Sequence, residues 1–220
     1  MIHRAGQRFV GGLGRTVKRA VDLIGAAGLL CVFAAPLGVA MVAIAVERTG
    51  PIFFRQWRVG RDGREFRVWK LRTMVPDAER TGLRQTLRRG DSRVTRVGRV
   101  LRDWGLDELP QLLNVICGQM SLVGPRPTLP YQVAHYDERQ RRRLEVRPGI
   151  TSLAVVRGRN ALSWARRIEL DIWYIDHWSL WLDVTILVRT LWCVLVTREG
   201  LYGDEVNDPF VEIPTEEGET

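Results

Sequence analysis

Two adjacent carboxylates, Asp107 and Glu108, are the residues of this sequence best suited to catalysis, and Arg126 follows them between two prolines. A carboxylate can attack phosphorus directly, provided that cations screen its charge. It also suits a hard cation such as Mg²⁺. The prolines fix two φ angles beside Arg126, so its guanidinium fork is presented to phosphate oxygens at low entropic cost. The pattern points to chemistry at a phosphate group.

These carboxylates should lie at the start of a helix. Apolar residues at positions 109, 112, 113 and 116 share one helical face, and Pro110 is tolerated only in a first turn. The helix is therefore predicted to begin near Leu106 or Asp107, where the helix dipole helps to keep Asp107 ionised. A plain N-terminal cap is the commoner role for such an aspartate, and the residues alone leave both roles open.

A β-hairpin is predicted upstream, with strands at about 52–57 and 66–71 separated by Gly60 and Gly63. Lys70 would lie at the end of its second strand. It is one of only two lysines, against 31 arginines. A compact ammonium group kept at this position suits a close phosphate or carboxylate contact, although chance placement is an equally good explanation.

The charge of the chain indicates an anionic partner. Net charge is +8, yet residues 204–220 hold seven acidic and no basic residues, so the remainder carries +15. Nucleic acid, an anionic lipid surface or a phosphorylated substrate would all fit. The three cysteines are far apart in apolar surroundings without metal-ligand spacing, which predicts buried, reduced thiols.

An uncharged stretch, Leu23–Val46, is long enough to span a bilayer as a straight helix. Pro36 lies inside it and predicts a kink. Arginines and lysines flank both sides, which by the positive-inside rule places both ends in the cytoplasm. A cleaved signal peptide is a weaker alternative because the apolar run is too long.

Two further segments have two interpretations each. A polar helix is predicted over 129–146, whose arginines would form a solvated face or contact lipid headgroups. Residues 164–197 hold five of the eight tryptophans, which suits a membrane interface or ordinary core packing. The acidic tail should be disordered.

From about residue 17 to about residue 200, the chain resembles the small monotopic polyprenyl-phosphate phosphoglycosyl transferases of the bacterial sugar transferase family. The resemblance rests on four segments in the family's order. They are Lys70-Leu71-Arg72-Thr73-Met74, Asp107-Glu108, Pro125-Arg126-Pro127 and Arg147-Pro148-Gly149-Ile150-Thr151.

The resemblance implies transfer of a phosphosugar from a UDP-sugar to polyprenyl (undecaprenyl) phosphate, with release of UMP, as the first step of glycoconjugate or exopolysaccharide synthesis. It implies that Asp107 is the nucleophile and a Mg²⁺ ligand, forming a covalent phosphosugar intermediate, and that Glu108 orients the site and Mg²⁺ or manages protons. It also implies a set of substrate-binding residues: Lys70, Arg72, Arg102, Arg126, Arg147, Arg157, Arg159 and Asn160. For Arg102, a surface ion pair with Asp103 is the alternative.

The resemblance further implies an α/β, mostly helical fold with a small β-hairpin or sheet and a re-entrant membrane helix. The expected organisation is a basic segment and membrane helix at 1–48, a catalytic domain at 49–200 and a tail at 201–220. Such a protein lies in the inner membrane with its active site facing the cytoplasm. Two departures from the family pattern are Ala35-Pro36 in place of Ser-Pro, and Ser152-Leu153-Ala154-Val155 in place of Gly-Trp-Ala-Gln.

Three other functions compete with this one. A non-catalytic basic membrane anchor or scaffold would use Asp107 only as a cap. A metal-dependent phosphohydrolase would pass the phosphosugar to water. Nucleic-acid binding rests on charge alone and lacks a recognisable motif, so no nucleic-acid partner is expected.

Overall fold

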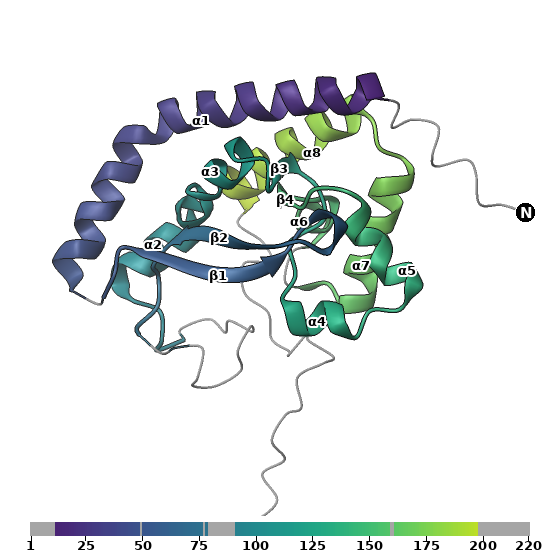
Figure 1. Cartoon of the computed structure of the whole chain (residues 1–220). Helices are drawn as coiled ribbons and strands as arrows, with labels where there is room; N and C mark the ends of the chain where they lie inside the picture. The colour runs from purple at the N-terminus through teal and green to yellow at the C-terminus, as the bar shows by residue number, and fades with distance from the viewer. Residues whose placement is uncertain (1–11, 49, 77, 79–90, 159–160, 198–220) are drawn as a thin grey trace, which may run out of the picture.

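The computed structural model describes residues 12–48, 50–76, 78, 91–158 and 161–197. A long N-terminal helix lies over a mostly helical body that contains two two-stranded sheets (Figure 1). This confirms the predicted mostly helical fold with small sheets. The tail at 201–220, Arg159 and Asn160 lie outside the described residues.

The elements follow one another in this order: α1 (Gly12–Glu47), β1 (Phe53–Val59), η2 (Arg61–Gly63), β2 (Glu65–Leu71), α2 (Arg96–Asp103), η3 (Leu106–Glu108), α3 (Gln111–Ile116), β3 (Ser121–Val123), α4 (Pro130–Ala134), α5 (Glu138–Arg141), η4 (Arg142–Glu145), β4 (Gly149–Thr151), α6 (Leu153–Arg157), α7 (Trp164–Asp176), α8 (Leu180–Trp192) and the π-helical turn η6 (Cys193–Thr197).

Helix α1 is a single element of 36 residues that contains Pro36. It is long and apolar enough to cross a membrane, and most of its large apolar side chains are exposed, which is compatible with a membrane anchor. Figure 1 shows that α1 arches over the body rather than running straight. Proline removes a backbone hydrogen bond inside a helix and is a common cause of such a bend.

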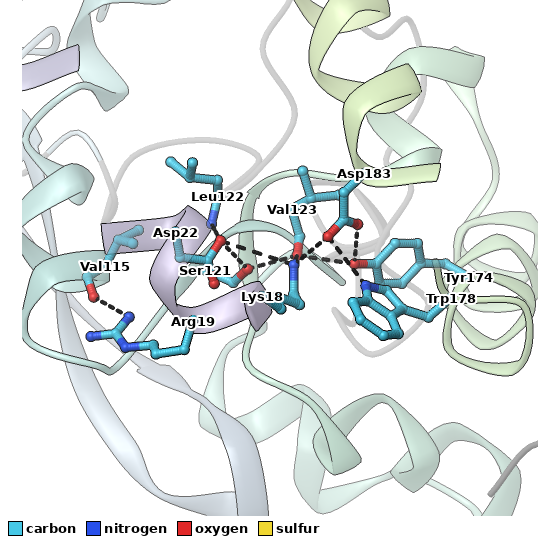
Figure 2. Close-up of polar contacts among 10 residues, drawn as sticks. All are labelled: Lys18, Arg19, Asp22, Val115, Ser121, Leu122, Val123, Tyr174, Trp178 and Asp183. Carbon is cyan, nitrogen blue, oxygen red and sulfur yellow. Dashed lines mark hydrogen bonds and ion pairs between the residues drawn. The ribbon is translucent and has the colours of Figure 1, made fainter. Parts of the chain in front are cut away.

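Both ends of α1 are attached to the body. Near its start, Asp22 Oδ1 accepts hydrogen bonds from Ser121 Oγ and Leu122 N, each at 3.0 Å (Figure 2). At its end, Glu47 Oε1 accepts from the backbone of Arg96 and Val97, at 2.9 and 3.3 Å, where α2 begins. The helix is therefore fastened to the body at both ends.

The exposure of α1 also corrects the prediction of buried thiols. Cys31, on α1, and Cys117 are exposed, while Cys193 is half-buried; all three are free thiols. Val32, next to Cys31, faces outward, whereas Leu30 on its other side packs against the larger apolar cluster. An apolar sequence context does not predict burial on a helix of this kind.

Strands β1 and β2 form the predicted hairpin, with Phe53 opposite Leu71 and Val59 opposite Glu65. The outer edge of β2 is covered by Asn114 of α3, a fully buried side chain. Its Nδ2 donates to Arg67 O at 2.8 Å, and its Oδ1 accepts from Trp69 N at 3.1 Å. One amide side chain thus satisfies strand groups that would otherwise need another strand.

Two apolar clusters hold these elements together. The larger joins the hairpin, α3, β3 and the C-terminal helices α6, α7 and α8. The smaller contains Ala40 and Ile44 of α1, Leu71 at the end of β2, and Leu101 of α2. Complete burial of each such leucine or isoleucine contributes about 1.5–3 kcal/mol, so this second cluster fixes α2 beside the end of the hairpin.

Strands β3 and β4 are parallel and approach each other closely because glycine lies on both sides. A Cβ atom on Gly149 would lie 2.1 Å from Gly124 N, and one on Gly124 would lie 2.5 Å from Arg147 O. Neither position has room for a side chain. The Gly124-Pro125 segment and the Pro148-Gly149 segment are therefore in backbone contact.

The prediction of a single helix over 129–146 is wrong. The structure has α4, α5 and η4 there, with a break at Tyr136 and Asp137. Asp137 caps α5 by accepting from Gln140 N at 2.7 Å, and this capping geometry starts a new helix rather than continuing α4. The break also turns Arg143 into the interior, so the arginines do not form one solvated face.

The clustered tryptophans divide between the two interpretations. Trp173, Trp181 and Trp192 are exposed, as a membrane interface would require. Trp178 is half-buried, and its Nε1 donates to Asp183 Oδ2 at 3.2 Å inside the body.

Candidate active site

The two carboxylates lie in the 3₁₀ turn η3, between α2 and α3. The prediction that they occupy the first turn of an α-helix is wrong, because α3 begins only at Gln111, after Pro110. Gly105, with φ +65°, takes the left-handed conformation that ends α2 and reverses the chain into η3. This reversal brings the carboxylates back beside the last turn of α2.

Glu108 is the carboxylate that contacts the cations. Its Oε1 lies 2.7 Å from Lys70 Nζ and 2.9 Å from Arg126 Nη2. The structure therefore brings together three predicted site residues from β2, η3 and the Pro-Arg-Pro segment. Burial alone would raise the pKa of Glu108, but the charges and hydrogen bonds of Arg126 and Lys70 hold it well below its ordinary value. Glu108 is ionised and neutralised by two cations.

Asp107 is in a different state. It is buried, and no hydrogen bond or ion pair to another described residue reaches its side chain. Burial raises its pKa, and the neighbouring charge of Glu108 raises it further, against the opposing effect of Lys70, Arg102 and Arg126. Two adjacent carboxylates thus have separate environments, one paired with cations and the other buried without a bonding partner among the described residues.

The pKa of Lys70 is lowered, first by burial and then by Arg126, while Glu108 opposes the shift. A lysine that sits between a carboxylate and a second cation suits a site that receives additional negative charge. The strand position predicted from the hairpin pattern is confirmed, since Lys70 is the penultimate residue of β2.

Arg102 lies at the end of α2 and donates from Nε to Thr73 Oγ1 at 2.7 Å. Helix α2 can approach Thr73 because residue 98 is glycine; a Cβ there would lie 2.2 Å from Thr73 O. The Lys-Leu-Arg-Thr-Met segment therefore holds Lys70 and positions Arg102 through Thr73. Among the charges acting on the Asp107 carboxyl group is that of Arg102.

The Pro125-Arg126-Pro127 segment is supported through its backbone. Gly149 N donates to Pro125 O at 2.9 Å, and Arg58 Nη1 donates to Pro127 O at 3.1 Å. Arg126 O accepts from Arg143 Nη2 at 3.2 Å. All three carbonyl groups are held, so the backbone that carries Arg126 is fixed by the body of the protein.

Sequence reasoning missed Arg143 and its partner Asp171. Their side chains are almost fully buried, with Arg143 Nη2 lying 2.7 Å from Asp171 Oδ2. Arg143 also donates to the Tyr136 hydroxyl group. Nothing separates Arg143 from its neighbours in a run of arginines. Asp171 did carry a signal, because it lies among Ile168, Leu170 and Ile172 on α7, where an acid is unexpected.

The remaining predicted residues make their contacts elsewhere. Arg147 Nε donates to Gly118 O at 2.9 Å, and its nearest charges include Arg61 and Arg19. Arg72 Nε donates to Pro51 O at 2.8 Å, which ties the end of β2 to the segment that joins α1 to β1. Arg157 is exposed at the end of α6.

The residues around Asp107 fit a magnesium ion better than a closed metal site. No group of three or more metal-ligating side chains occurs within the described part of the chain. Structural zinc sites need four protein ligands, whereas Mg²⁺ is usually held by one or two carboxylates together with substrate phosphates and water. One carboxylate without a bonding partner among the described residues, beside an array of cationic side chains, matches the second arrangement.

Comparison with known proteins agrees with this geometry. Residues 13–197 match the family described as bacterial sugar transferase. An uncharacterised sugar transferase, EpsL of Bacillus subtilis, is 44% identical over 185 residues, which cover 84% of this chain and 90% of that protein. A UDP-glucose:undecaprenyl-phosphate glucose-1-phosphate transferase of Caulobacter vibrioides is 46% identical, and the match covers 82% of this chain and 70% of that protein.

A protein of the same description from Escherichia coli is 38% identical over 85% of this chain but only 42% of its own length. The matched region contains every described candidate site residue, from Lys70 to Arg157. The length of these matches and their sequence identity both exceed what a shared short motif would produce. This chain belongs to the bacterial sugar transferase family, and it is an enzyme of the transferase class.

Proposed function

We propose that this protein transfers a sugar 1-phosphate from a UDP-sugar to polyprenyl phosphate through a covalent intermediate on Asp107. The observation that carries the proposal is the division between the two carboxylates. Glu108 is neutralised by Lys70 and Arg126, while Asp107 is buried beside the same cations with no bonding partner among the described residues. A nucleophile needs this freedom, and its approach to a diphosphate needs those cations.

In the first step, a carboxylate oxygen of Asp107 forms a bond to the β-phosphorus of the UDP-sugar. The bond from that phosphorus to the bridging oxygen breaks, and UMP leaves with this oxygen and its electron pair. In the second step, an oxygen of polyprenyl phosphate attacks the same phosphorus. The acyl phosphate bond breaks, which restores the Asp107 carboxylate and gives polyprenyl diphosphosugar.

The chain's own residues would bind and orient the phosphates. Arg126, held through its backbone, and Lys70 would bind diphosphate oxygens, and Glu108 would keep both cations in place. Arg102 would add positive charge from α2. Asp107 would be the protein ligand of Mg²⁺, which supplies charge neutralisation at the transferring phosphoryl group when bound.

The attachment of α1 at both ends favours a re-entrant arrangement at the inner membrane. Asp22 and Glu47, near opposite ends of α1, are both hydrogen-bonded to the body. A helix that crossed the bilayer would have to separate these contacts onto opposite sides. A helix that enters and leaves through one leaflet keeps both, with the active site facing cytoplasmic UDP-sugars.

The test is release of UMP by purified protein in detergent with Mg²⁺, undecaprenyl phosphate and a panel of UDP-sugars. The expected result is lipid-dependent turnover by the wild type, lost on chelation, and a loss of about 10³-fold or more in Asp107→Asn. Intact-protein mass spectrometry after incubation with UDP-sugar alone should show a phosphosugar adduct on the wild type only.

Each rival function gives a different result in this assay. Turnover that does not need the lipid and yields free sugar 1-phosphate would identify a phosphohydrolase. No turnover with any donor, with Asp107→Asn unaltered in membrane binding, would favour a non-catalytic anchor. Equal UMP release by wild type and Asp107→Asn would remove Asp107 as the nucleophile.

A further inference from the structure

The first turns of α1, here called its base, carry four charged residues, Arg15, Lys18, Arg19 and Asp22, on a helix that is otherwise mostly apolar. Charged residues beside a membrane segment usually extend into water or toward lipid headgroups. Here Lys18, Arg19 and Asp22 turn toward the body and meet residues from β3, α3 and α8 (Figure 2). Asp22 is 3% exposed, so it is not a solvated surface charge.

Strand β3 is held to α1 along its length. Asp22 accepts from Ser121 Oγ and Leu122 N, and Lys18 Nζ donates to Val123 O at 3.2 Å. Arg19 extends the contact to α3, where it donates to the carbonyl oxygens of Val115 and Ile116, at 2.7 and 3.0 Å.

Lys18 also links this strand to the C-terminal helices. Its Nζ lies 2.6 Å from Asp183 Oδ2, a carboxylate on α8 that is 6% exposed. Asp183 Oδ1 accepts from the Tyr174 hydroxyl group at 2.7 Å, and Oδ2 accepts from Trp178 Nε1 at 3.2 Å. One ammonium group thus joins α1, β3 and α8 (Figure 2).

The strand held in this way leads directly into the active site. Val123, whose carbonyl group accepts from Lys18, is followed by Gly124, Pro125 and Arg126. Helix α3, bonded to Arg19, follows the turn that carries Asp107 and Glu108. The base of α1 therefore touches both segments that bring the cation and the carboxylates together.

Stability alone is a weak explanation for this cluster. A buried ion pair gains little over apolar side chains of the same volume, because taking two charges out of water offsets most of their attraction. What a buried pair does provide is a single geometry. Each of the chain's two lysines pairs with a carboxylate, Lys70 with Glu108 and Lys18 with Asp183.

We propose that Lys18 and Asp22 are positioning residues, which fix the membrane helix to β3 and thereby hold Arg126 in place against Glu108. Neither residue touches the reacting atoms. Their effect on turnover rests on the proposed transferase function, whereas their effect on β3 does not.

The test combines two measurements on Lys18→Met, which keeps an unbranched side chain and removes the charge. The first is hydrogen–deuterium exchange of residues 121–126 in detergent, which should become about fivefold faster, while exchange of the hairpin at 53–71 stays unchanged. The second is steady-state kinetics, in which kcat should fall about tenfold or more and the KM for the UDP-sugar should change less than about threefold.

Asp22 provides a conservative pair of variants. Asp22→Asn keeps the oxygen that accepts from Ser121 and Leu122, whereas Asp22→Leu removes it. We expect Asp22→Leu to behave like Lys18→Met and Asp22→Asn to recover most of the lost turnover. Arg166→Gln, which breaks an exposed ion pair with Glu169 elsewhere on the surface, is the control for loss of one positive charge.

Unchanged exchange at 121–126 in both Lys18→Met and Asp22→Leu would overturn the proposal, even if turnover fell. Faster exchange everywhere would also overturn it, because that result describes general loss of stability. If the wild type shows no transferase activity, the proposed function fails, and the exchange measurements still decide whether α1 positions β3.

Discussion

Lys70 Nζ lies 2.7 Å from Glu108 Oε1 and so joins the end of strand β2 to the turn that carries both carboxylates. The contact fixes Glu108, not its neighbour. Arg126 approaches the same oxygen of Glu108 at 2.9 Å. The ion pairs with Lys70 and Arg126 therefore involve Glu108 and leave Asp107 without an ionic partner among the described residues. The roles of the two acids can be separated by mutation.

Glu108→Gln should slow the enzyme without removing the covalent step. The amide cannot neutralise Lys70 and Arg126, so their positions relax, and we expect kcat to fall by about 10²-fold. The phosphosugar adduct on Asp107 should still form and be visible by mass spectrometry after long incubation. A Glu108→Gln protein that never forms the adduct, with wild-type thermal stability, would show that the covalent step itself requires Glu108.

Lys70→Arg should not be a conservative change. The guanidinium group is planar and wider than an ammonium group, and Lys70 lies in a largely buried space beside Glu108, whose Oε1 it shares with Arg126. We expect kcat/KM for the UDP-sugar to fall about 10- to 100-fold. Arg55→Lys, on the exposed face of β1, is a control for exchanging the two cations and should leave kcat/KM within about twofold. Equal activity of Lys70→Arg and wild type would show that charge alone is needed.

The dependence of stability on pH should differ between wild type and Glu108→Gln. The folded protein holds the pKa of Glu108 below its unfolded value of 4.5, so below that pH the unfolded chain binds the extra proton first. The stability contributed by Glu108 is complete above the unfolded pKa and is lost as pH falls, at no more than about 1.4 kcal/mol per pH unit. Thermal unfolding in detergent with a chelator should show the gap in Tm between the two proteins narrowing on acidification. A gap that stays constant down to about pH 3 would contradict this assignment.

Breaking the buried pair between Arg143 and Asp171 should separate stability from activity. Asp171→Leu alone leaves a buried, unpaired guanidinium group and should cost about 3–5 kcal/mol in the free energy of unfolding. The double variant Arg143→Met/Asp171→Leu should regain most of that stability. The kcat of the double variant should stay below that of the wild type, because Arg126 O has lost the hydrogen bond that Arg143 donates. Full recovery of kcat in the double variant would mean that Arg143 does not position Arg126.

The sequence predicted those parts of the site that depend on local patterns. Alternating apolar residues and two glycines predicted the hairpin and placed Lys70 near the end of β2, as found. The helix predicted from apolar periodicity was wrong at Asp107. Gly105, in the left-handed conformation, and Pro110 bound a separate turn before α3. A helical pattern of apolar residues does not distinguish such a 3₁₀ turn from the first turn of an α-helix.

Long-range contacts could not be predicted in the same way. No local pattern distinguishes Asn114 from another polar residue of an amphipathic helix, yet it covers the edge of β2. Arg143 looked like its neighbours in the arginine run, and only the break at Asp137 turns it inward. Such roles depend on which segments come into contact in the folded chain, and local sequence patterns do not predict those contacts.

The pairing of Lys18 with Asp183 spans 165 positions, and this separation sets an order on biosynthesis. A ribosome produces the apolar helix first and the carboxylate that pairs with Lys18 near the end of the described chain. Until α8 has emerged, Lys18 lacks this partner, whereas the hydrogen bonds that Asp22 accepts from Ser121 and Leu122 can already form. A product that stops before α8 would therefore keep β3 bonded to α1 but lack the ionic link between α1 and the C-terminal helices.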